Sequence, residues 1–355
     1  MPSNSHSKEA LLYNQLEAKK VACRLCAQKC VIADGKRGFC NVRENRDGTL
    51  YTLVYGRTIA SNTDPVEKKP FYHFQPGSLA YSIATPGCNF RCQWCQNCEI
   101  SQAPSRRHLT LGTPMTPQQI VHTAQGNSCT SIAYTYTEPT VFFEYSYDTA
   151  RHAREKGLAN IYVTNGYMTN DMLDLMYPYL DAATVDLKAF RDETYWTYAR
   201  AHLEPVLESL RKMKEQNVWT EVTTLVIPGI NDDEQELRDA ARFLSQELGP
   251  ETPWHLSRFF PAFRMTHLPP TPVSTLRRAC EIGREEGLSY VYLGNTGEGA
   301  DTACPSCGST VIRRSGFHAS RNLLDENGRC PHCGTRIRGV GMGSESEHGA
   351  TGTDT

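Results

Sequence analysis

The sequence has no long apolar run, and nothing in it approaches the roughly 20 residues that a membrane-spanning helix needs. Residues 1–10 are polar and lack the apolar core of a secretory signal. A large charge excess is also absent, because the formal net charge is −2 over 355 residues. Nothing overall therefore favours nucleic acid or an anionic membrane. Together these absences predict a cytoplasmic protein with neither a membrane nor a nucleic acid as partner.

Cysteine, in contrast, is abundant, with 14 residues in the chain. Without an export signal the thiols are expected to stay reduced, so disulfides are a poor explanation for them. Most of the cysteines cluster at spacings that are typical of metal ligands. We therefore interpret these clusters as metal sites. Cys129 and Cys280 stand apart, in strand-like and helix-like contexts, and are predicted to be core residues.

From residue 78 onward, apolar strand-like runs alternate with helix-like stretches. Strands are expected at 79–84, 131–136, 160–163, 183–187, 220–227, 255–259 and 290–293. Helices are expected at 117–124, 141–156, 171–179, 204–216, 234–248 and 274–286. This alternation predicts βαβ units around a parallel sheet, either a partial or full (β/α) barrel or an open doubly wound sheet. In each of these folds, ligands bind at the carboxyl ends of the strands.

The whole chain is predicted to fall into four parts. These are an N-terminal Cys-rich region over 1–77, a barrel core over 78–300, a four-cysteine ribbon over 301–338 and a disordered tail over 339–355. The tail is assigned from its Gly, Ser, Thr and Glu content. Residues 1–20 are expected to form a short polar helix or an unstructured arm.

A C-x3-C-x2-C motif, made by Cys88, Cys92 and Cys95, directly follows the first expected strand. Thiolates bind iron–sulfur clusters, and a [4Fe–4S] cube normally takes four of them. Three ligands leave one iron open, and an open metal position is where a substrate or cofactor binds. The amino and carboxylate groups of S-adenosylmethionine (SAM) suit such an iron. A zinc site or three buried thiols are the alternatives, and Cys98 would seal the open iron if it were a fourth ligand.

The motif, with the aromatic Trp94 before its last cysteine, resembles the radical SAM superfamily. The resemblance implies a partial (β/α) barrel, a [4Fe–4S] cluster and SAM as cofactor, with Trp94 beside it. It also implies reductive SAM cleavage to a 5′-deoxyadenosyl radical, hydrogen abstraction from an unidentified substrate, and an electron donor such as flavodoxin or ferredoxin. Because the superfamily pattern needs only three cysteines, Cys98 is interpreted as a free thiol.

Polar residues follow the next expected strands, and their roles come from the same resemblance. In activating enzymes of this superfamily a Glu-Pro at the end of the second strand contacts the amino group of SAM, which assigns that role to Glu138. A turn at a helix start is the alternative interpretation of Glu138-Pro139. Thr164 and Asn165 follow the third strand, where polar groups are expected to meet the cofactor.

Asp186 and Lys188 end the fourth expected strand. A buried Asp/Lys pair is unfavourable unless it binds something. In similar activases this pair faces SAM, with the Lys near its carboxylate, so the resemblance implies catalytic and cofactor-binding roles; a solvated ion pair is the alternative. Asn295, after the last strand, is expected to contact adenosine. His255 and Arg258 are expected to face the active centre. The alternative for His255 is a buried core histidine whose hydrogen bonds are satisfied.

The resemblance extends to the radical SAM member of the AmmeMemoRadiSam system, a prokaryotic group, over residues 20–340. Supporting stretches lie at 23–26, 35–40, 64–70 and 73–77. It implies Amme-like and Memo-like proteins as partners. The nearest understood relatives are activating enzymes of glycyl radical enzymes, such as pyruvate formate-lyase, which abstract hydrogen from a glycine of a partner protein. This chain departs from them by its Cys-rich ends and by having no ferredoxin-like insertion, so a glycine substrate does not follow.

Two further Cys-rich modules flank the barrel. Cys304, Cys307, Cys330 and Cys333 form two C-x2-C pairs, which predict a four-cysteine zinc ribbon, with a rubredoxin-like iron centre as the alternative. The basic residues of this ribbon are expected on a solvated face, with contact to a partner or to nucleic acid as the alternative; they are Arg313, Arg314, Arg336 and Arg338.

At the amino end, four cysteines lie within 18 residues and almost require a metal; they are Cys23, Cys26, Cys30 and Cys40. Zinc and a second iron–sulfur cluster both fit this pattern, and zinc is slightly favoured because four thiolates fill its coordination sphere.

The sequence thus supports three alternative hypotheses about the function. The first is a catalytic radical SAM enzyme, the second a glycyl radical enzyme activase, and the third a non-catalytic zinc-ribbon interaction protein. The third would be indicated by loss of a central cysteine or of Glu138, and all of these are present.

Overall fold

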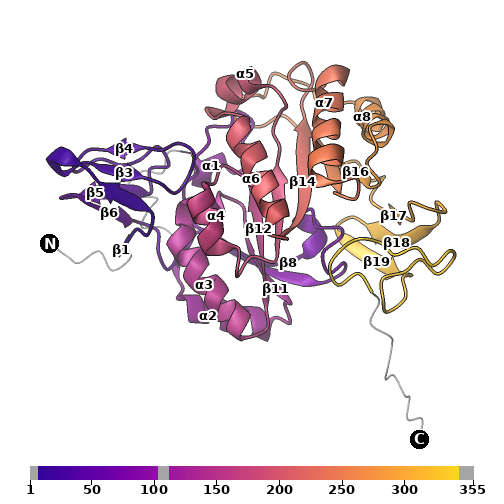
Figure 1. Ribbon diagram of the computed structural model, residues 1–355, viewed down its shortest axis with the longest axis horizontal. Helices are drawn as coiled ribbons and strands as arrows, with labels where there is room; N and C mark the ends of the chain where they lie inside the picture. Colours follow the sequence, from indigo (N-terminus) through magenta and orange to yellow (C-terminus); the bar gives the residue numbers. More distant parts are fainter. Residues whose placement is uncertain (1–6, 103–111, 344–355) are drawn as a thin grey trace, which may run out of the picture.

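The computed structural model describes residues 7–102 and 112–343. Its centre is an eight-stranded sheet in the order β16-β15-β14-β13-β12-β11-β9-β8 (Figure 1). The seven parallel strands are β9 (Leu79–Ala84), β11 (Ser131–Tyr134), β12 (Ala159–Thr164), β13 (Ala182–Asp186), β14 (Trp219–Val226), β15 (Trp254–Arg258) and β16 (Val291–Gly294). The antiparallel strand β8 (Ala60–Pro65) pairs with β9. Because β8 and β16 form opposite edges, the fold is a partial (β/α) barrel, as the sequence predicts.

Helices fill the crossovers between the parallel strands, as Figure 1 shows. The longer ones are α2 (Pro117–Gly126), α3 (Phe143–Glu155), α4 (Asn170–Met176), α6 (Glu204–Glu215), α7 (Glu234–Phe243) and α8 (Val273–Glu285). Shorter turns are η1 (Glu17–Lys19), η2 (Val66–Lys68), α1 (Cys98–Ser101), η4 (Pro139–Phe142), α5 (Asp192–Thr194), η5 (Tyr195–Ala199) and η6 (Leu244–Leu248). Some of the longer helices have side-chain caps, since the Thr116 side chain caps α2 and the Asp233 side chain caps α7.

The two faces of the sheet are covered differently. Because successive strand residues point to opposite sides, Tyr81 and Val185 join the core beneath the helices. Their neighbours on the concave side, such as Ala80 and Ala182, pack with Phe71 from the segment after η2. Ala80 and Ala182 lie near the amino ends of their strands, so the segment after η2, which carries Phe71 and Phe74, closes that end of the barrel. We call this segment the plug. The carboxyl ends remain for a ligand site.

The N-terminal module consists of short antiparallel strands. One sheet has the order β1-β6-β5 and another β2-β3-β4, with β7 paired to β10. The strands are β1 (Lys8–Glu9), β2 (Tyr13–Gln15), β3 (Val21–Cys23), β4 (Val31–Ile32), β5 (Arg43–Arg46), β6 (Thr49–Thr52), β7 (Arg57–Thr58) and β10 (Thr113–Pro114). The expected polar helix or arm over 1–20 is wrong for residues 7–20, which form β1, β2 and the turn η1; residues 1–6 lie outside the described ranges.

This module is fixed to the barrel by a buried ion pair. The two terminal guanidinium nitrogens of Arg43, Nη1 and Nη2, donate to the Glu144 carboxylate on α3, at 3.1 and 2.7 Å. The two side chains are 2% and 0% exposed, so the pair is shielded from water. Removal of either side chain would leave the other as an unpaired buried charge, which is strongly destabilising.

The C-terminal module is a three-stranded antiparallel sheet of β17 (Thr302–Ala303), β18 (Thr310–Ser315) and β19 (His318–Asn322). The expected solvated basic face is wrong for Arg314, which is buried and donates to Thr302 Oγ1 at 2.8 Å and to Tyr72 O at 2.8 Å. Residues 339–343 were expected to belong to the disordered tail. They instead pack on the segment after η2, where Val340 forms main-chain hydrogen bonds with His73 and Gln75, and Met342 is buried. Residues 344–355 of that tail lie outside the described ranges.

A buried polar network joins the plug, the barrel and the ribbon. Glu221 on β14 accepts hydrogen bonds from the main-chain N–H groups of Tyr72 and His73, at 3.0 and 2.8 Å. His255 Nε2 donates to the same carboxylate at 2.7 Å. The other ring, His73, contacts Tyr292 Oη and Arg338 O, both at 2.6 Å. Because these groups are buried, each hydrogen bond replaces water that the site has lost.

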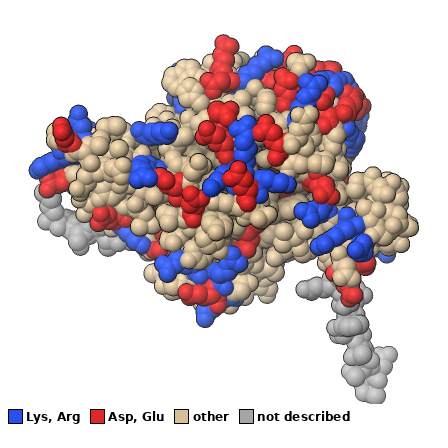
Figure 2. Space-filling view, viewed as in Figure 1, with Lys and Arg blue, Asp and Glu red and all other residues tan. Residues whose placement is uncertain are grey.

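The outer surface carries charges of both signs. Figure 2 shows Lys and Arg interspersed with Asp and Glu over the helices of the face in view. Within the described ranges, no helix has the length and apolar character needed to cross a bilayer.

Candidate active site

A cavity of about 450 Å³ opens at the carboxyl ends of the parallel strands. Cofactor pockets typically have volumes of roughly 300–1,000 Å³. Ten residues that the sequence predicts for the central site line this one cavity: Cys88, Cys92, Trp94, Cys95, Glu138, Thr164, Asn165, Asp186, Lys188 and Asn295. The structure therefore gathers residues from five strand ends into a single place.

The three central thiols lie on the loop after β9. Main-chain N–H of Phe90 donates to Cys88 Sγ at 3.3 Å, and Cys95 Sγ lies 3.1 Å from Ser101 Oγ. Burial raises the pKa of the Cys92 thiol to about 12, which disfavours the thiolate that a metal ligand needs, so metal binding at this site would be coupled to loss of the proton. Cys98, at the start of α1, does not line the cavity.

The spacing of these thiols argues against a single zinc ion. Zn–S bonds of about 2.3 Å in a tetrahedron place sulfurs about 3.8 Å apart. Within residues 7–102 and 112–343, only the ribbon has three or more ligand atoms of Cys, His, Asp or Glu that all lie within 4.8 Å of one another. The sulfurs of the three central thiols are therefore further apart than this limit. A cube, whose irons occupy separate corners, accommodates that wider spacing.

Glu138 is a buried carboxylate that faces the thiols. Its Oε1 accepts hydrogen bonds from Thr140 Oγ1 at 2.6 Å and from Thr164 Oγ1 at 2.7 Å, and its Oε2 accepts one from Asn165 N at 2.8 Å. Burial raises the pKa of Glu138, although its hydrogen bonds from Asn165, Thr140 and Thr164 act in the opposite direction, and among the described residues it forms no ion pair with a Lys or Arg. The carboxylate is thus held in place, with acceptor capacity left on Oε2 and no cation beside it.

Thr164 and Asn165 serve Glu138 rather than facing the cavity as free polar groups. The Asn165 amide is also engaged: Nδ2 donates to Asn89 Oδ1 at 2.7 Å, and Oδ1 accepts from Tyr167 N at 3.1 Å. These contacts fix the loop after β12 against the loop that carries Cys88.

Asp186 and Lys188 form an ion pair of 2.7 Å at the end of β13. Burial alone would lower the pKa of Lys188, but nearby negative charge, above all the Asp186 carboxylate, more than offsets it, so the pKa is raised. Lys188 is held at its main chain, where its N–H donates to Tyr195 Oη at 2.9 Å and its carbonyl accepts from Asn231 Nδ2 at 2.8 Å. The ammonium therefore stays charged at the cavity wall.

The rest of the wall combines aromatic and small polar groups. Trp94 is buried, with its ring 6.3 Å from that of Tyr198. Asn295 Nδ2 donates to Ser257 Oγ at 3.0 Å, and both residues line the cavity. Thr223 Oγ1 is buried there without a hydrogen-bond partner among the described atoms, which marks a place for a polar ligand atom.

One polar group at the cavity edge was not predicted from the sequence. Lys69 lies against the Tyr136 ring, 4.1 Å from its centroid, and pairs with Asp64 at 2.7 Å. Tyr136 Oη donates to the same carboxylate at 2.5 Å. Lys69 and Tyr136 line the cavity, but they come from the end of η2 and the end of β11, so no local spacing connects them.

His255 and Arg258 do not line this cavity. His255 is the buried partner of Glu221, so of its two expected roles it takes that of a satisfied core residue. Arg258 Nε donates to Thr271 O at 2.8 Å. Cys129 and Cys280 are buried, as predicted.

The ribbon holds a second candidate metal site. Its four thiol sulfurs all lie within 4.8 Å of one another, with Cys304 and Cys333 at 3.5 Å and Cys307 and Cys330 at 3.7 Å. These separations fit a single tetrahedral ion with S–S distances of about 3.8 Å.

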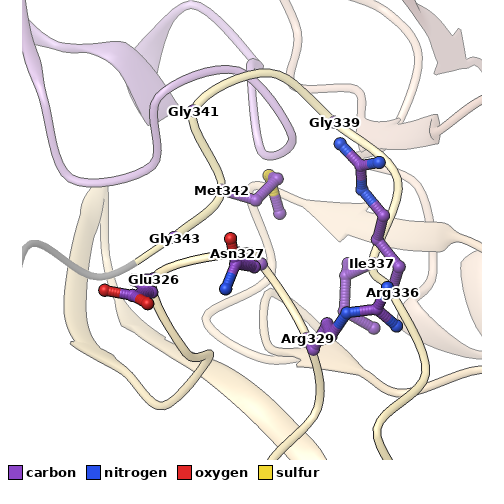
Figure 3. Close-up of a pocket in the computed structure, with 10 residues that line it drawn as sticks. Glu326, Asn327, Arg329, Arg336, Ile337, Gly339, Gly341, Met342 and Gly343 are labelled. Carbon is purple, nitrogen blue, oxygen red and sulfur yellow. The ribbon is translucent and has the colours of Figure 1, made fainter.

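A separate cavity within the ribbon has no such chemistry. Figure 3 shows Glu326, Asn327 and Arg329 on one loop, facing the segment that carries Arg336 and Met342. None of the thiols lines this cavity. We assign it no catalytic role.

A thiol-lined cavity at the strand ends of a partial barrel, with a held carboxylate and an ion pair in its wall, defines an α/β metalloenzyme. The family model described as "Radical SAM superfamily" matches residues 82–241, which contain the three thiols, Glu138 and the ion pair. An uncharacterized protein of Methanocaldococcus jannaschii is 44% identical over 333 residues, which cover 93% of this chain and 98% of that protein. The chain belongs to the radical SAM superfamily.

More distant relatives are activating enzymes. The isethionate sulfite-lyase activating enzyme of Oleidesulfovibrio alaskensis is 25% identical over 163 residues, 44% of this chain and 53% of that enzyme. The pyruvate formate-lyase 1-activating enzyme of Escherichia coli (strain K12) is 21% identical over 159 residues, 44% of this chain and 65% of that enzyme. The similarity to each thus covers less than two thirds of the relative.

Proposed function

We propose that this chain binds a [4Fe–4S] cluster through Cys88, Cys92 and Cys95 and cleaves SAM reductively to abstract hydrogen from a substrate. The observation that carries this proposal is Glu138, a buried carboxylate without a cationic partner among the described residues, facing three thiols too far apart for zinc. When bound, the cluster supplies one electron to SAM, whose carbon–sulfur bond breaks to give methionine and a 5′-deoxyadenosyl radical.

The protein's own groups bind and orient the cofactor. Glu138 accepts the SAM ammonium at Oε2, while Thr164 and Asn165 keep the carboxylate in place. Lys188, held charged by Asp186, faces the SAM carboxylate. Trp94 and Asn295 complete the wall against which adenosine packs.

Reduced protein supplied with SAM is expected to release 5′-deoxyadenosine and methionine, measured by liquid chromatography. Glu138→Gln removes one charge-assisted hydrogen bond of about 1.5–3 kcal/mol, so the SAM affinity should fall about 10- to 100-fold while the cluster remains. The matched control is Glu236→Gln, a buried carboxylate that accepts from Phe190 N at 2.7 Å outside the cavity. No cleavage by the wild type, or unchanged SAM affinity in Glu138→Gln, would contradict the proposal.

A second candidate is activation of a glycyl radical enzyme, favoured by the two activating enzymes among the relatives. A glycyl radical signal in electron paramagnetic resonance (EPR), appearing on an added partner protein only with SAM and reductant, is the expected result for that role. A small molecule of changed mass in the same mixture, with no protein radical, would instead identify a metabolic enzyme.

The stretches at 23–26, 35–40, 64–70 and 73–77 also support membership of the AmmeMemoRadiSam system, with Amme-like and Memo-like proteins as partners. An electron donor of the flavodoxin or ferredoxin type, a cytoplasmic location and zinc in the ribbon complete the proposal. A non-catalytic ribbon protein has less support, because all three thiols and Glu138 share one cavity.

A further inference from the structure

The four N-terminal thiols form their own cluster of side chains. Cys23, Cys26, Cys30 and Cys40 all line one small cavity, together with apolar groups such as Leu25, Ile32 and Val141. They come from β3, the following turns and the loop before β5, so the fold brings them together from separate segments of the module. The proposed SAM cleavage at the central site assigns them no role.

Both the N-terminal thiols and the central thiols are more widely spaced than the ribbon thiols. The four ribbon sulfurs lie within 4.8 Å of one another, as a single zinc ion requires. Among the residues that the structure describes, no three of the N-terminal sulfurs meet that limit, and neither do the three central ones. The ribbon therefore shows the spacing that suits a single tetrahedral ion, and the N-terminal set does not match it.

We propose that Cys23, Cys26, Cys30 and Cys40 bind a second [4Fe–4S] cluster rather than zinc. Each thiolate then binds a different corner of the cube, which the wider spacing suits. Because all four corners are filled, no iron remains for a substrate. The chemistry left to such a cluster is electron transfer.

The N-terminal cavity directly adjoins the loop that carries the central thiols. Asn89, the neighbour of Cys88, lines this cavity and accepts a hydrogen bond from Asn165 Nδ2 at 2.7 Å. Gly87 has φ +105°, and a Cβ there would lie 3.1 Å from Cys40 O and 2.6 Å from Val42 Cγ1. A side chain at this position would push the two loops apart, so Gly87 permits the close approach.

Arg91 lies between the two sets of thiols. Its guanidinium donates to Cys88 O at 2.9 Å and to Phe39 O, and it stacks 4.1 Å from the Phe39 ring centroid. A cation without a carboxylate partner among the described residues would reduce the repulsion between two anionic clusters.

This arrangement suits a one-electron relay, which is the part of the inference that rests on the proposed function. A donor protein with a low-potential flavin or iron–sulfur centre passes one electron to the N-terminal cluster, taking it from the 2+ to the 1+ state. That electron then moves to the central cluster, and the N-terminal cluster returns to 2+. One electron enters and one leaves for each SAM cleaved.

The metal assignment is tested in protein with Cys88→Ala, Cys92→Ala and Cys95→Ala combined, reconstituted without oxygen. We expect about four irons per chain in cluster form and about one zinc, against about eight irons in the wild type. Absence of cluster absorption, with about two zinc ions per chain, would overturn the assignment. Because this variant cannot cleave SAM, its metal content reports on the N-terminal site whatever the outcome for the proposed function.

A second measurement uses Cys30→Ala, with Cys280→Ala as the control for loss of a buried thiol elsewhere. EPR spectra of the reduced wild type should show coupling between two nearby spins, and Cys30→Ala should leave one uncoupled signal; identical spectra would contradict two clusters. Cleavage driven by reduced flavodoxin should fall severalfold more in Cys30→Ala than cleavage driven by dithionite. Equal losses would overturn the relay.

Discussion

Replacement of Cys92 by Ala is expected to abolish SAM cleavage while zinc in the ribbon is retained. Cys92 is the most buried of the three central thiols, and its loss leaves two ligands for the cube. A cube that is bound by only two protein thiolates is not held firmly enough to present an open iron to SAM. Iron and zinc analysis, together with 5′-deoxyadenosine release by the reduced protein, measures both effects.

Two companion variants make this result specific. Cys129→Ala removes a buried thiol far along the chain from the motif and should leave cluster and activity in place. Cys98→Ala should also remain active, because Cys98 does not line the cavity. Full central-cluster signal in Cys92→Ala would mean that the ligands are misassigned, and loss of the cluster in Cys98→Ala would mean that a fourth side chain closes the open iron.

Replacement of Cys330 by Ala is expected to release about one zinc per chain and unfold the ribbon. The ribbon is a three-stranded sheet with a small core, and structural zinc contributes about 10–16 kcal/mol of apparent binding energy in zinc-finger peptides, so a loss of several kcal/mol is expected here. Metal analysis and limited proteolysis of the region after residue 300 would report the change.

The effect should reach the barrel, because Arg314 of the ribbon donates to Tyr72 O and lies 3.7 Å from the Glu67 carboxylate. Release of the ribbon would leave Glu67 buried without its cation, so the thermal midpoint of the barrel should also fall. The control variant Cys280→Ala, which changes a residue outside the ribbon, should retain the zinc of the ribbon. A Cys330→Ala protein that retains zinc and resists protease would show that these thiols do not hold the metal.

Much of the barrel was predictable because each of its elements carries a local signal. β9 matches the expected 79–84, and α2, α6 and α7 begin at the expected residues 117, 204 and 234. The N-terminal strands were not predictable, since β1 has two residues and β2 has three, too few for any periodicity. The polar β8 was missed for a related reason: its pairing with β9 is a tertiary contact.

The candidate site shows the same division. Contiguous motifs predicted the three thiols, Glu138 and the Asp186–Lys188 pair, and all of them line one cavity. No local pattern indicated that the Thr164 hydroxyl would donate to Glu138, because the two lie 26 residues apart. Lys69 and Asp64 were missed because neither the turn η2 nor the edge strand β8 carries a ligand-binding motif.

The last described residues set a limit on how the chain can be shortened or fused. Val340 forms a bridge with Phe74, its N–H donates to His73 O at 2.8 Å, and its carbonyl accepts from Gln75 N at 2.7 Å. Met342 is buried just beyond. Residues 339–343 therefore behave as an additional strap across the base of the barrel. A shortened chain that stops at the ribbon would lose that strap, so affinity tags and truncation points belong after Gly343.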